Sequence, residues 1–457
     1  MLIRKQSLQQ VLRLVLDQRI AQGCDLDSES FRARIKLAAD SYDALYELAL
    51  ELRSPAVRSD WPYCEPLEWE EIRTESPSLN PGKSWPTPDF ELVAKRVQAG
   101  FLGSVCGCML GKPIEVDPTL DELRRAGMSC DEWPLNDYVT SSFLDALGRR
   151  HESAPYTTRE ALGSAVADDD LHYSLIGMRL LELHGVEFTH EQLAEIWAMN
   201  MPPLWTWGAE RTALLGLGIE QHHMLEPAEF DAIHDVLMLN PGDESCGAMI
   251  RVDAYGYACP GNPDLAAWLA FKDASLTHTR TGVYGAMFIA ALISLCLAAD
   301  SELKGNDRLE LVLLALARIP AQSRLSAIIR DSVEKVAAAD DWLAAYDQIH
   351  GRYREYTHCQ MYQEIGTLIN TLKFAESVGG GFCMQVSQGN DTDSFGATAG
   401  SILGCLFGPD ELEERWLRPL NNRLDHGLSD FHEYRLNVLV DRMGNLASRI
   451  YRSADNA

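Results

Sequence analysis

The hydrophobic and polar positions of the chain recur with the period of an α-helix along most of its length. Residues 6–22 and 28–52 carry apolar positions three and four apart, which predicts two amphipathic helices. From residue 91 onward one helical pattern follows another, and no run of alternating residues typical of strands appears. The pattern predicts an all-α protein.

Residues 54–90, between these helical regions, are rich in Pro and Trp. Proline removes backbone donors and stops helices, so this stretch is predicted to be a long connector. Its tryptophans Trp61, Trp69 and Trp85 are too apolar for a free linker, and we expect them to lie against the main body. The predicted organisation is a helical N-terminal extension (1–53), the connector (54–90) and one large domain (91–457).

Three of the predicted helices carry glycines that share one helix face. A glycine destabilises a helix interior by roughly 0.5–1 kcal/mol relative to alanine, so the repetition needs a compensating gain. Close approach of neighbouring helices supplies one, and a tightly packed helical centre is therefore expected. The glycines are Gly103, Gly107 and Gly111, then Gly282 and Gly285, then Gly396, Gly400, Gly404 and Gly408.

Residues 282–299 form the only apolar stretch that approaches membrane-spanning length. The stretch is at the short edge of the roughly 17–25 residues that a span requires, so a buried helix is predicted.

The first 23 residues carry charges throughout and do not read as a secretory signal. Most of the eleven cysteines sit in apolar contexts without a CxxC motif, which favours buried free thiols in a reducing cytosol. We expect a cytoplasmic protein without a membrane partner.

The chain of 457 residues has 40 Lys+Arg and 67 Asp+Glu, a formal net charge of −27. Binding of a polyanion requires clustered Lys and Arg, so nucleic acid is not expected as the main ligand. At 46% hydrophobic residues the composition is that of a globular protein with a large core. The acidity itself fits either a solubilising surface or a site that gathers a cation.

Acidic residues gather where the predicted helices begin or end. Glu115 follows the first glycine-rich helix, the run Asp168-Asp169-Asp170 opens another helix, and Asp391-Thr392-Asp393-Ser394 opens the last glycine-rich helix. A single Asp at a helix N-terminus is ordinarily a cap, but clustered carboxylates repel each other unless they share a positive charge. Hard divalent cations take oxygen ligands, so one or two Mg²⁺ or Mn²⁺ ions would suit these residues.

Five motifs in this order resemble the ADP-ribosylglycohydrolases, the family of the dinitrogenase-reductase-activating glycohydrolase and the ADP-ribosyl-acceptor hydrolases. The motifs are GFLGSVCGCMLGKPIE, ADDD, SCGAMIRVDAYGY, DASLTHTRTGVYGA and GNDTDSFGATAGSILGCLFG, spread from about residue 97 to 408. The longer segment around the third motif and the N-terminal region are similar to a larger bacterial branch. The resemblance implies a compact orthogonal helical bundle in which residues 91–457 are the catalytic domain.

The resemblance also implies a dinuclear Mg²⁺ or Mn²⁺ centre that cleaves the glycosidic bond of an ADP-ribosyl group, small or protein-linked. By this resemblance Glu115 and Asp169 would be the catalytic residues. A turn of the chain and residues near it would bind the substrate and hold its diphosphate, and a further set of residues would bind the metal. The substrate-binding residues would be Ser245, Cys246, Gly247, Ala248, Arg251 and His278, and the metal ligands Asp168, Asp169, Asp391, Asp393 and Ser394.

The sequence departs from the family pattern at three places. Ala167 removes a hydroxyl ligand, and Ser394 replaces Thr conservatively. Ser245-Cys246 replaces Gly-Asn in the phosphate turn, where Gly permits backbone conformations that Ser avoids. The change in this turn puts ADP-ribose itself in question against a smaller ribosyl compound.

Several assignments have ordinary structural alternatives. Arg251 would pair with an internal carboxylate, His278 would be a hydrogen-bonded core histidine, and Asp170 would be a plain helix cap. Tyr255 and Tyr257 are expected to be core residues.

The sequence leaves three alternative functions for the protein. The first is a divalent-metal-dependent hydrolase of ADP-ribosyl groups. The second is a non-catalytic regulatory protein that binds ADP-ribose or a nucleotide, which Ala167 and the altered turn favour. The third is a hydrolase of nucleosides or other small ribosyl compounds. The oligomeric state is left open.

Overall fold

The protein is described here by a computed structural model, which covers residues 4–454 except residues 77, 83–86 and 221–238. Within these residues the regular structure is helical, and only four isolated β-bridges interrupt it. The all-α fold class expected from the sequence is confirmed.

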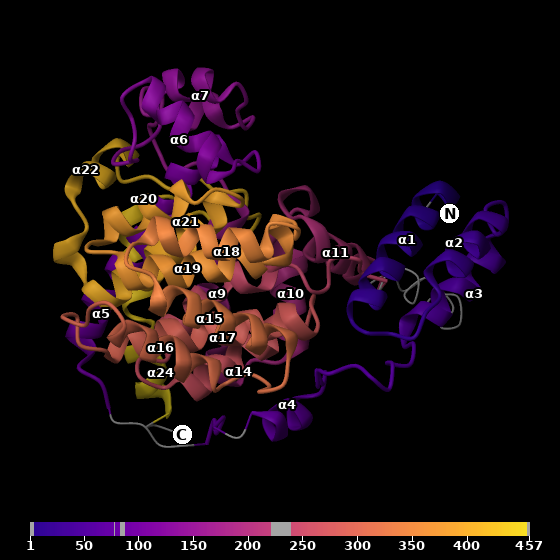
Figure 1. The fold of residues 1–457 in the computed structure, drawn as a ribbon. Coiled ribbons are helices and arrows are strands. Elements are labelled where there is room, and N and C mark those ends of the chain that lie inside the picture. The colour runs from indigo at the N-terminus through magenta and orange to yellow at the C-terminus, as the bar shows by residue number, and fades with distance from the viewer. Residues whose placement is uncertain (1–3, 77, 83–86, 221–238, 455–457) are drawn as a thin grey trace.

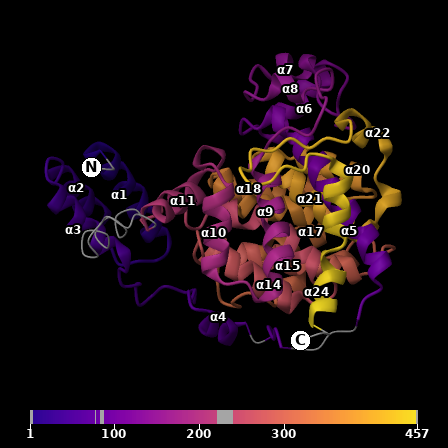
Figure 2. The ribbon, with the colours of Figure 1, turned by 180° about the vertical axis from the view of Figure 1, so that it is seen from behind.

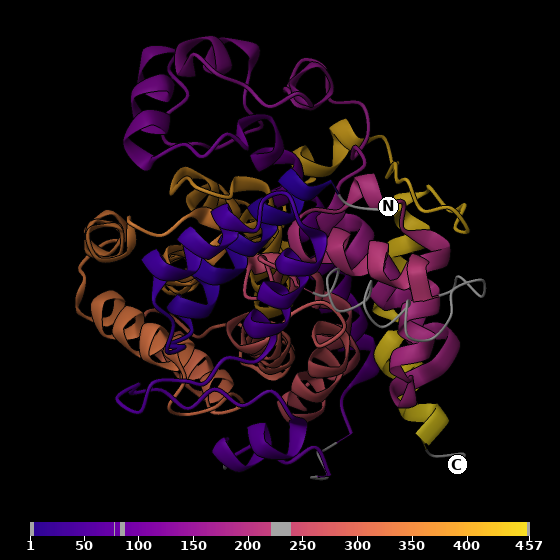
Figure 3. The same ribbon diagram turned by 90° about the vertical axis from the view of Figure 1, so that its right-hand side faces the viewer.

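The first three helices form a small group beside the main body in Figures 1 and 2, and they lie in front of it in Figure 3. They share a hydrophobic cluster that is separate from the large core. The single helix predicted over residues 28–52 is wrong, because the hydroxyl of Ser41 accepts a hydrogen bond from the Ala44 amide (3.2 Å) and so starts a new helix. The three helices are α1 (Lys5–Ala21), α2 (Ser28–Leu37) and α3 (Tyr42–Arg53).

The connector contains one short helix, α4 (Trp69–Glu75). The ring of Trp69 lies 4.3 Å from that of Trp268, so this tryptophan packs on the main body as expected. Trp61 instead lies against Gly23 at the end of the N-terminal helices. Trp85 lies outside the described residues. The division into extension, connector and domain stays a prediction.

The centre of the main body is a pair of closely packed helices, α5 (Phe90–Gly111) and α21 (Thr392–Phe407). Their glycine faces meet, and a Cβ at Gly107 would lie 2.0 Å from the carbonyl oxygen of Gly396. Only glycine permits this distance, so the close approach predicted from the glycine spacing is confirmed. It also fixes the end of α5 against the start of α21, where the hydroxyl of Thr392 donates to the Gly111 carbonyl (2.9 Å).

The third glycine-bearing helix, α15 (Arg280–Ala298), packs against both helices of this pair. Among the described helices it alone is long and apolar enough to span a membrane, and 89% of that apolar stretch is buried inside the protein. The prediction of a buried core helix is confirmed, and Figure 2 shows the helix enclosed by its neighbours.

The remaining helices surround this centre, and α6, α7 and α8 form a small group at the top of Figure 2. Their bounds are α6 (Leu120–Ser129), α7 (Ser141–Leu147), α8 (Ala154–Thr157), α9 (Asp169–His184), α10 (His190–Asn200), α11 (Gly208–Glu220), α13 (Asp253–Ala258), α14 (Pro263–Ala274), α16 (Asp307–Leu316), α17 (Arg324–Ala338), α18 (Trp342–Tyr353), α19 (Tyr362–Phe374), α20 (Val378–Ser387), α22 (Glu414–Leu417), α23 (Leu436–Gly444) and α24 (Leu446–Ala454). Short 3₁₀ turns are η1 (Lys112–Ile114), η2 (Gly185–Glu187), η3 (Pro203–Trp205), η4 (Cys246–Arg251), η5 (His358–Gln360), η6 (Pro409–Glu411) and η7 (Arg418–Leu420).

Candidate active site

A pocket of about 360 Å³ lies where the ends of these helices meet. Its walls come from segments far apart in the sequence: the turn after α5, the starts of α9 and α21, the start of η4, and η5. The structure brings eight of the residues expected from the sequence to this pocket: Glu115, Asp169, Ser245, Cys246, Gly247, Asp391, Asp393 and Ser394.

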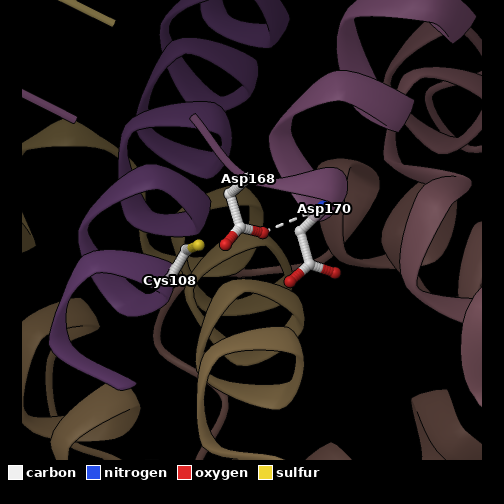
Figure 4. Close-up of side chains that lie close together, drawn as sticks. All are labelled: Cys108, Asp168 and Asp170. Carbon is white, nitrogen blue, oxygen red and sulfur yellow. Dashed lines mark hydrogen bonds between the residues drawn. The ribbon is translucent and has the colours of Figure 1, made fainter. Parts of the chain in front are cut away.

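Asp168 lies just beneath the pocket and is 2% exposed. Its carboxylate accepts a hydrogen bond from the backbone amide of Asp170 (3.0 Å), so Asp168 caps α9 (Figure 4). The expectation that Asp170 is the plain cap is wrong, because the side chain of Asp170 lies inside the first turn of the helix. Its Oδ1 atom is buried without a hydrogen-bond partner.

Lys112 was not predicted as a site residue from the sequence, yet its ammonium lies among the carboxylates of the site. Its Nζ atom is 2.7 Å from Asp168, 2.7 Å from Glu115 and 2.8 Å from Asp393. The side chain is almost fully buried, and the three carboxylates raise the pKa of Lys112 well above its ordinary value although burial lowers it. A permanent positive charge of the chain itself therefore lies inside the acidic centre. The only signal in the sequence is a lysine between a glycine-rich helix and Glu115.

One ammonium does not balance the carboxyl groups that face it. Among the described residues the acidic centre contains six carboxyl groups, those of Glu115, Asp168, Asp169, Asp170, Asp391 and Asp393.

Burial and the neighbouring Asp168 raise the pKa of Asp169 well above its ordinary value. Burial and Asp393 likewise raise the pKa of Glu115 to about 10. Burial raises the pKa of Asp393 too, but Lys112 overcomes this effect and holds it below the ordinary value. The excess negative charge favours a further cation or bound protons.

These residues fit a divalent metal ion. Asp170 and Asp393 each present a buried Oδ1 atom that has no hydrogen-bond partner, and carboxylate oxygens are the ligands of hard cations. The Sγ atom of Cys108 and carboxylate oxygens of Asp168 and Asp170 lie within 4.8 Å of one another (Figure 4). Burial raises the pKa of the Cys108 thiol, so it stays protonated and is a poor ligand for such a cation.

The turn formed by Ser245, Cys246 and Gly247 makes the opposite wall. Behind it lies the buried carboxylate of Glu210, so close that a Cβ at Gly247 would meet its Oε1 atom at 2.2 Å. Burial raises the pKa of Glu210 to about 6, against the effect of Arg251. A side chain in place of Gly247 would displace the Glu210 carboxylate.

Arg251, Ala248 and His278 lie in the protein interior behind this turn and do not line the pocket. The Arg251 guanidinium donates to Glu210 (2.8 Å) and Asp273 (2.5 Å), the internal pairing weighed as its alternative. His278 bonds Thr277 through Nδ1 (2.7 Å), and burial lowers its pKa well below the ordinary value. The substrate roles of these three residues stay predictions.

Tyr255 and Tyr257 are fully buried, in line with the expectation of core residues. Tyr255 donates to Asp273 (2.9 Å), and the hydroxyls of Tyr257 and Ser401 lie 2.6 Å apart.

A third wall was not expected from the sequence. The imidazole of His358 lies 2.5 Å from the carboxylate of Asp117, and both residues line the pocket. Next to it, Cys359 interacts with Cys246, whose thiol donates to Asp391 (3.7 Å). Interactions with Cys246 and His358 lower the pKa of Cys359 to about 5. The rings of Tyr173 and Trp207 complete the lining.

The site thus consists of buried carboxylates at the N-termini of two helices of an all-α domain, beside an open pocket, and such groups suit acid–base or cation-assisted chemistry. The ADP-ribosylglycohydrolase family model matches residues 89–455. The chain therefore belongs to the ADP-ribosylglycohydrolase family, and the class of activity is that of a glycohydrolase.

One solved chain, from an "ADP-ribosylglycohydrolase-related protein complex", is 18% identical to this protein. The alignment covers 79% of this chain and 99% of that chain, with a TM-score of 0.47. No curated protein matches the chain.

Proposed function

We propose that the protein is a divalent-metal-dependent hydrolase that cleaves the N- or O-glycosidic bond of an ADP-ribosyl or related ribosyl group. The observation that carries this proposal is the meeting of Glu115, Asp169, Asp391 and Asp393 in one pocket of a chain that belongs to this family. A cytoplasmic setting is part of the proposal, on the ground that most of the cysteines are buried as free thiols.

The proposed cation is Mg²⁺ or Mn²⁺, in one or two copies. It would be held by the oxygens of Asp168, Asp169, Asp391, Asp393 and Ser394. When bound, such an ion lowers the pKa of a water molecule and helps to orient it.

The protein's own residues have distinct parts in the proposed reaction. Water adds to the anomeric carbon, the bond to the leaving nitrogen or oxygen breaks, and the leaving group takes up a proton. Glu115 is half-buried at the pocket and accepts a hydrogen bond from Lys112, which places its carboxyl group to hold or move a proton near the reacting bond. Asp169 points into the same space and would position the attacking water.

The test is Asp391→Asn, measured against Asp410→Asn at an exposed aspartate just beyond the same helix. We expect Asp391→Asn to abolish hydrolysis with its helical content unchanged, and Asp410→Asn to leave turnover unaltered. The assay screens ADP-ribosylated amino acids, ADP-ribose esters and nucleosides with Mg²⁺, with Mn²⁺ and with chelator. Undiminished turnover in Asp391→Asn or in chelator would contradict the proposal. Binding of ADP-ribose without any turnover would favour the non-catalytic regulatory protein.

One observation favours the smaller ribosyl substrate as a second candidate. Among the described residues, no lysine or arginine lines the pocket. Lys112 and Arg251, which lie beneath it, are engaged with carboxylates, and Glu210 backs the turn expected to hold a diphosphate. An anionic diphosphate would meet negative charge at this turn. Turnover of nucleosides with no turnover of ADP-ribosyl compounds would decide for this candidate.

A further inference from the structure

The segment that leads into the turn at 245–247 lies between the N-terminal helices and the main body. Leu239, at its start, is buried in the hydrophobic cluster of α1–α3. Asp243 and Glu244 directly precede Ser245, which lines the pocket. Figures 1 and 2 show α11 reaching from the main body toward these helices in both views.

Asp243 is held by the last turn of α1. Its carboxylate accepts hydrogen bonds from Gln18 and from the guanidinium of Arg19 (3.2 Å), and both side chains of the ion pair are about nine-tenths buried. Arg19 is itself fixed, because it also donates to the Leu52 carbonyl (3.0 Å) and to Gln22 (2.7 Å). The backbone carbonyl of Asp243 accepts from the Thr279 amide (2.6 Å) on the other side.

Glu244 is held in a similar way by three parts of the chain. Its carboxylate accepts from Gln22 (3.0 Å), from Arg324 at the start of α17 (2.5 Å) and from the Thr281 amide (3.2 Å). Arg324 in turn bonds Glu65 of the connector (2.8 Å). The extension, the connector and the main body thus all meet at the two residues before the turn.

We propose that the N-terminal extension contributes to the substrate site. In this proposal Arg19 and Gln22 are positioning residues that hold the turn at 245–247 in place. Buried, charge-assisted hydrogen bonds fix direction as well as distance, so they hold the backbone of 243–244 in one place. The turn continues directly from these residues, and its Ser245, Cys246 and Gly247 line the pocket. This proposal depends on the proposed function in one respect, because it takes the turn at 245–247 to contact the substrate.

Two variants test the proposal from its two sides. Arg19→Met removes the charge from the helix with little change of volume, and Asp243→Asn removes the charge from the loop and leaves α1 intact. The matched control is Arg34→Met, which breaks the exposed pair of Arg34 with Glu51 inside the same extension. Arg19→Lys keeps the positive charge and should lie between the parent and Arg19→Met.

The measurements are hydrogen exchange of residues 239–251 and, for the best substrate of the screen, kcat and KM. We expect faster exchange in both variants and KM raised roughly tenfold with kcat nearly unchanged, because the carboxylate centre is untouched. The double variant should behave like either single one, since both remove the same contact.

Exchange and KM that stay at parental values in both variants would overturn the proposal. If Arg19→Met unfolds the extension, the result with Asp243→Asn decides alone. If the parent turns over nothing in the screen, the proposed function fails while the exchange data still decide this inference.

Discussion

At the scale of single residues, Lys112 determines how charge is balanced at the acidic centre. Its ammonium contacts three carboxylates that come from three segments of the chain. Removing one partner of such a buried cluster leaves uncompensated charge, which is strongly destabilising. Lys112 therefore stabilises the centre before any ion binds.

Lys112→Met is predicted to lower the free energy of unfolding by about 3–5 kcal/mol in chelator. Mg²⁺ should restore more stability to this variant than to the parent, because the divalent ion then meets more unbalanced carboxylate. Denaturant unfolding with Mg²⁺ and with chelator measures both effects. The control is Lys95→Met in the preceding helix α5, whose ion pair with Glu91 is exposed and should change stability little. A Lys112→Met protein as stable as the parent in chelator would rule this account out.

At the scale of elements, the close contact of α5 with α21 sets the geometry of the site, since it brings the turn with Glu115 against the turn with Asp391. Gly107→Ala would force a methyl group against the Gly396 carbonyl, which lies 2.0 Å from the added Cβ. Overpacking of this kind typically destabilises by about 1–3 kcal/mol, and backbone on both sides leaves little room to relax. We predict a loss at the upper end of that range, or failure to fold.

Gly351→Ala is the matched control for this prediction, because Gly351 lies in α18 and an added Cβ meets nothing within 4 Å. It should raise the free energy of unfolding by roughly 0.5–1 kcal/mol, as expected for Gly→Ala in an open helix position. Thermal and denaturant unfolding of both variants provide the comparison. Equal effects of the two substitutions would show that the glycine faces do not require glycine.

At the scale of the whole molecule, one contribution to the pH dependence of stability comes from a single carboxyl group buried in the core. Asp253 accepts hydrogen bonds from Ser104 of α5 (3.4 Å) and Ser174 of α9 (3.5 Å). Burial raises its pKa from 3.8 to about 7, although these serines lower it. The folded protein then holds a proton that the unfolded chain releases, so this contribution to stability is lost as the pH rises from about 4 to about 7.

Asp253→Asn removes this dependence. Relative to the parent, the variant should gain about 4 kcal/mol of unfolding free energy between pH 4 and pH 7, as the pKa shift of Asp253 implies, and no more above pH 7. Unfolding curves at several pH values give the difference, with Asp410→Asn as the exposed control. A difference that does not change with pH would contradict the assigned titration of Asp253.

The sequence alone predicted the helical fold, the contact of the glycine faces and most of the acidic residues at the pocket. These features depend on local spacing: Asp391 and Asp393 follow directly from one motif, and Gly103 and Gly107 lie on one helix face. Lys112 was missed because its partner Asp393 lies 281 residues away in the sequence, and no local pattern reports such a contact. For the same reason the sequence could not show that Glu210 and Asp273 hold Arg251 in the interior.

The family match begins at residue 89, whereas the bonds to Asp243 and Glu244 begin at residue 18. An expression fragment trimmed to the matched residues would keep every carboxylate of the centre and lose Arg19, Gln22 and Glu65. Leu239 would lose the apolar cover that α1–α3 provide, and a newly exposed apolar surface invites aggregation. An inactive or insoluble fragment would then be a false negative for the enzyme, so substrate screens need the full chain.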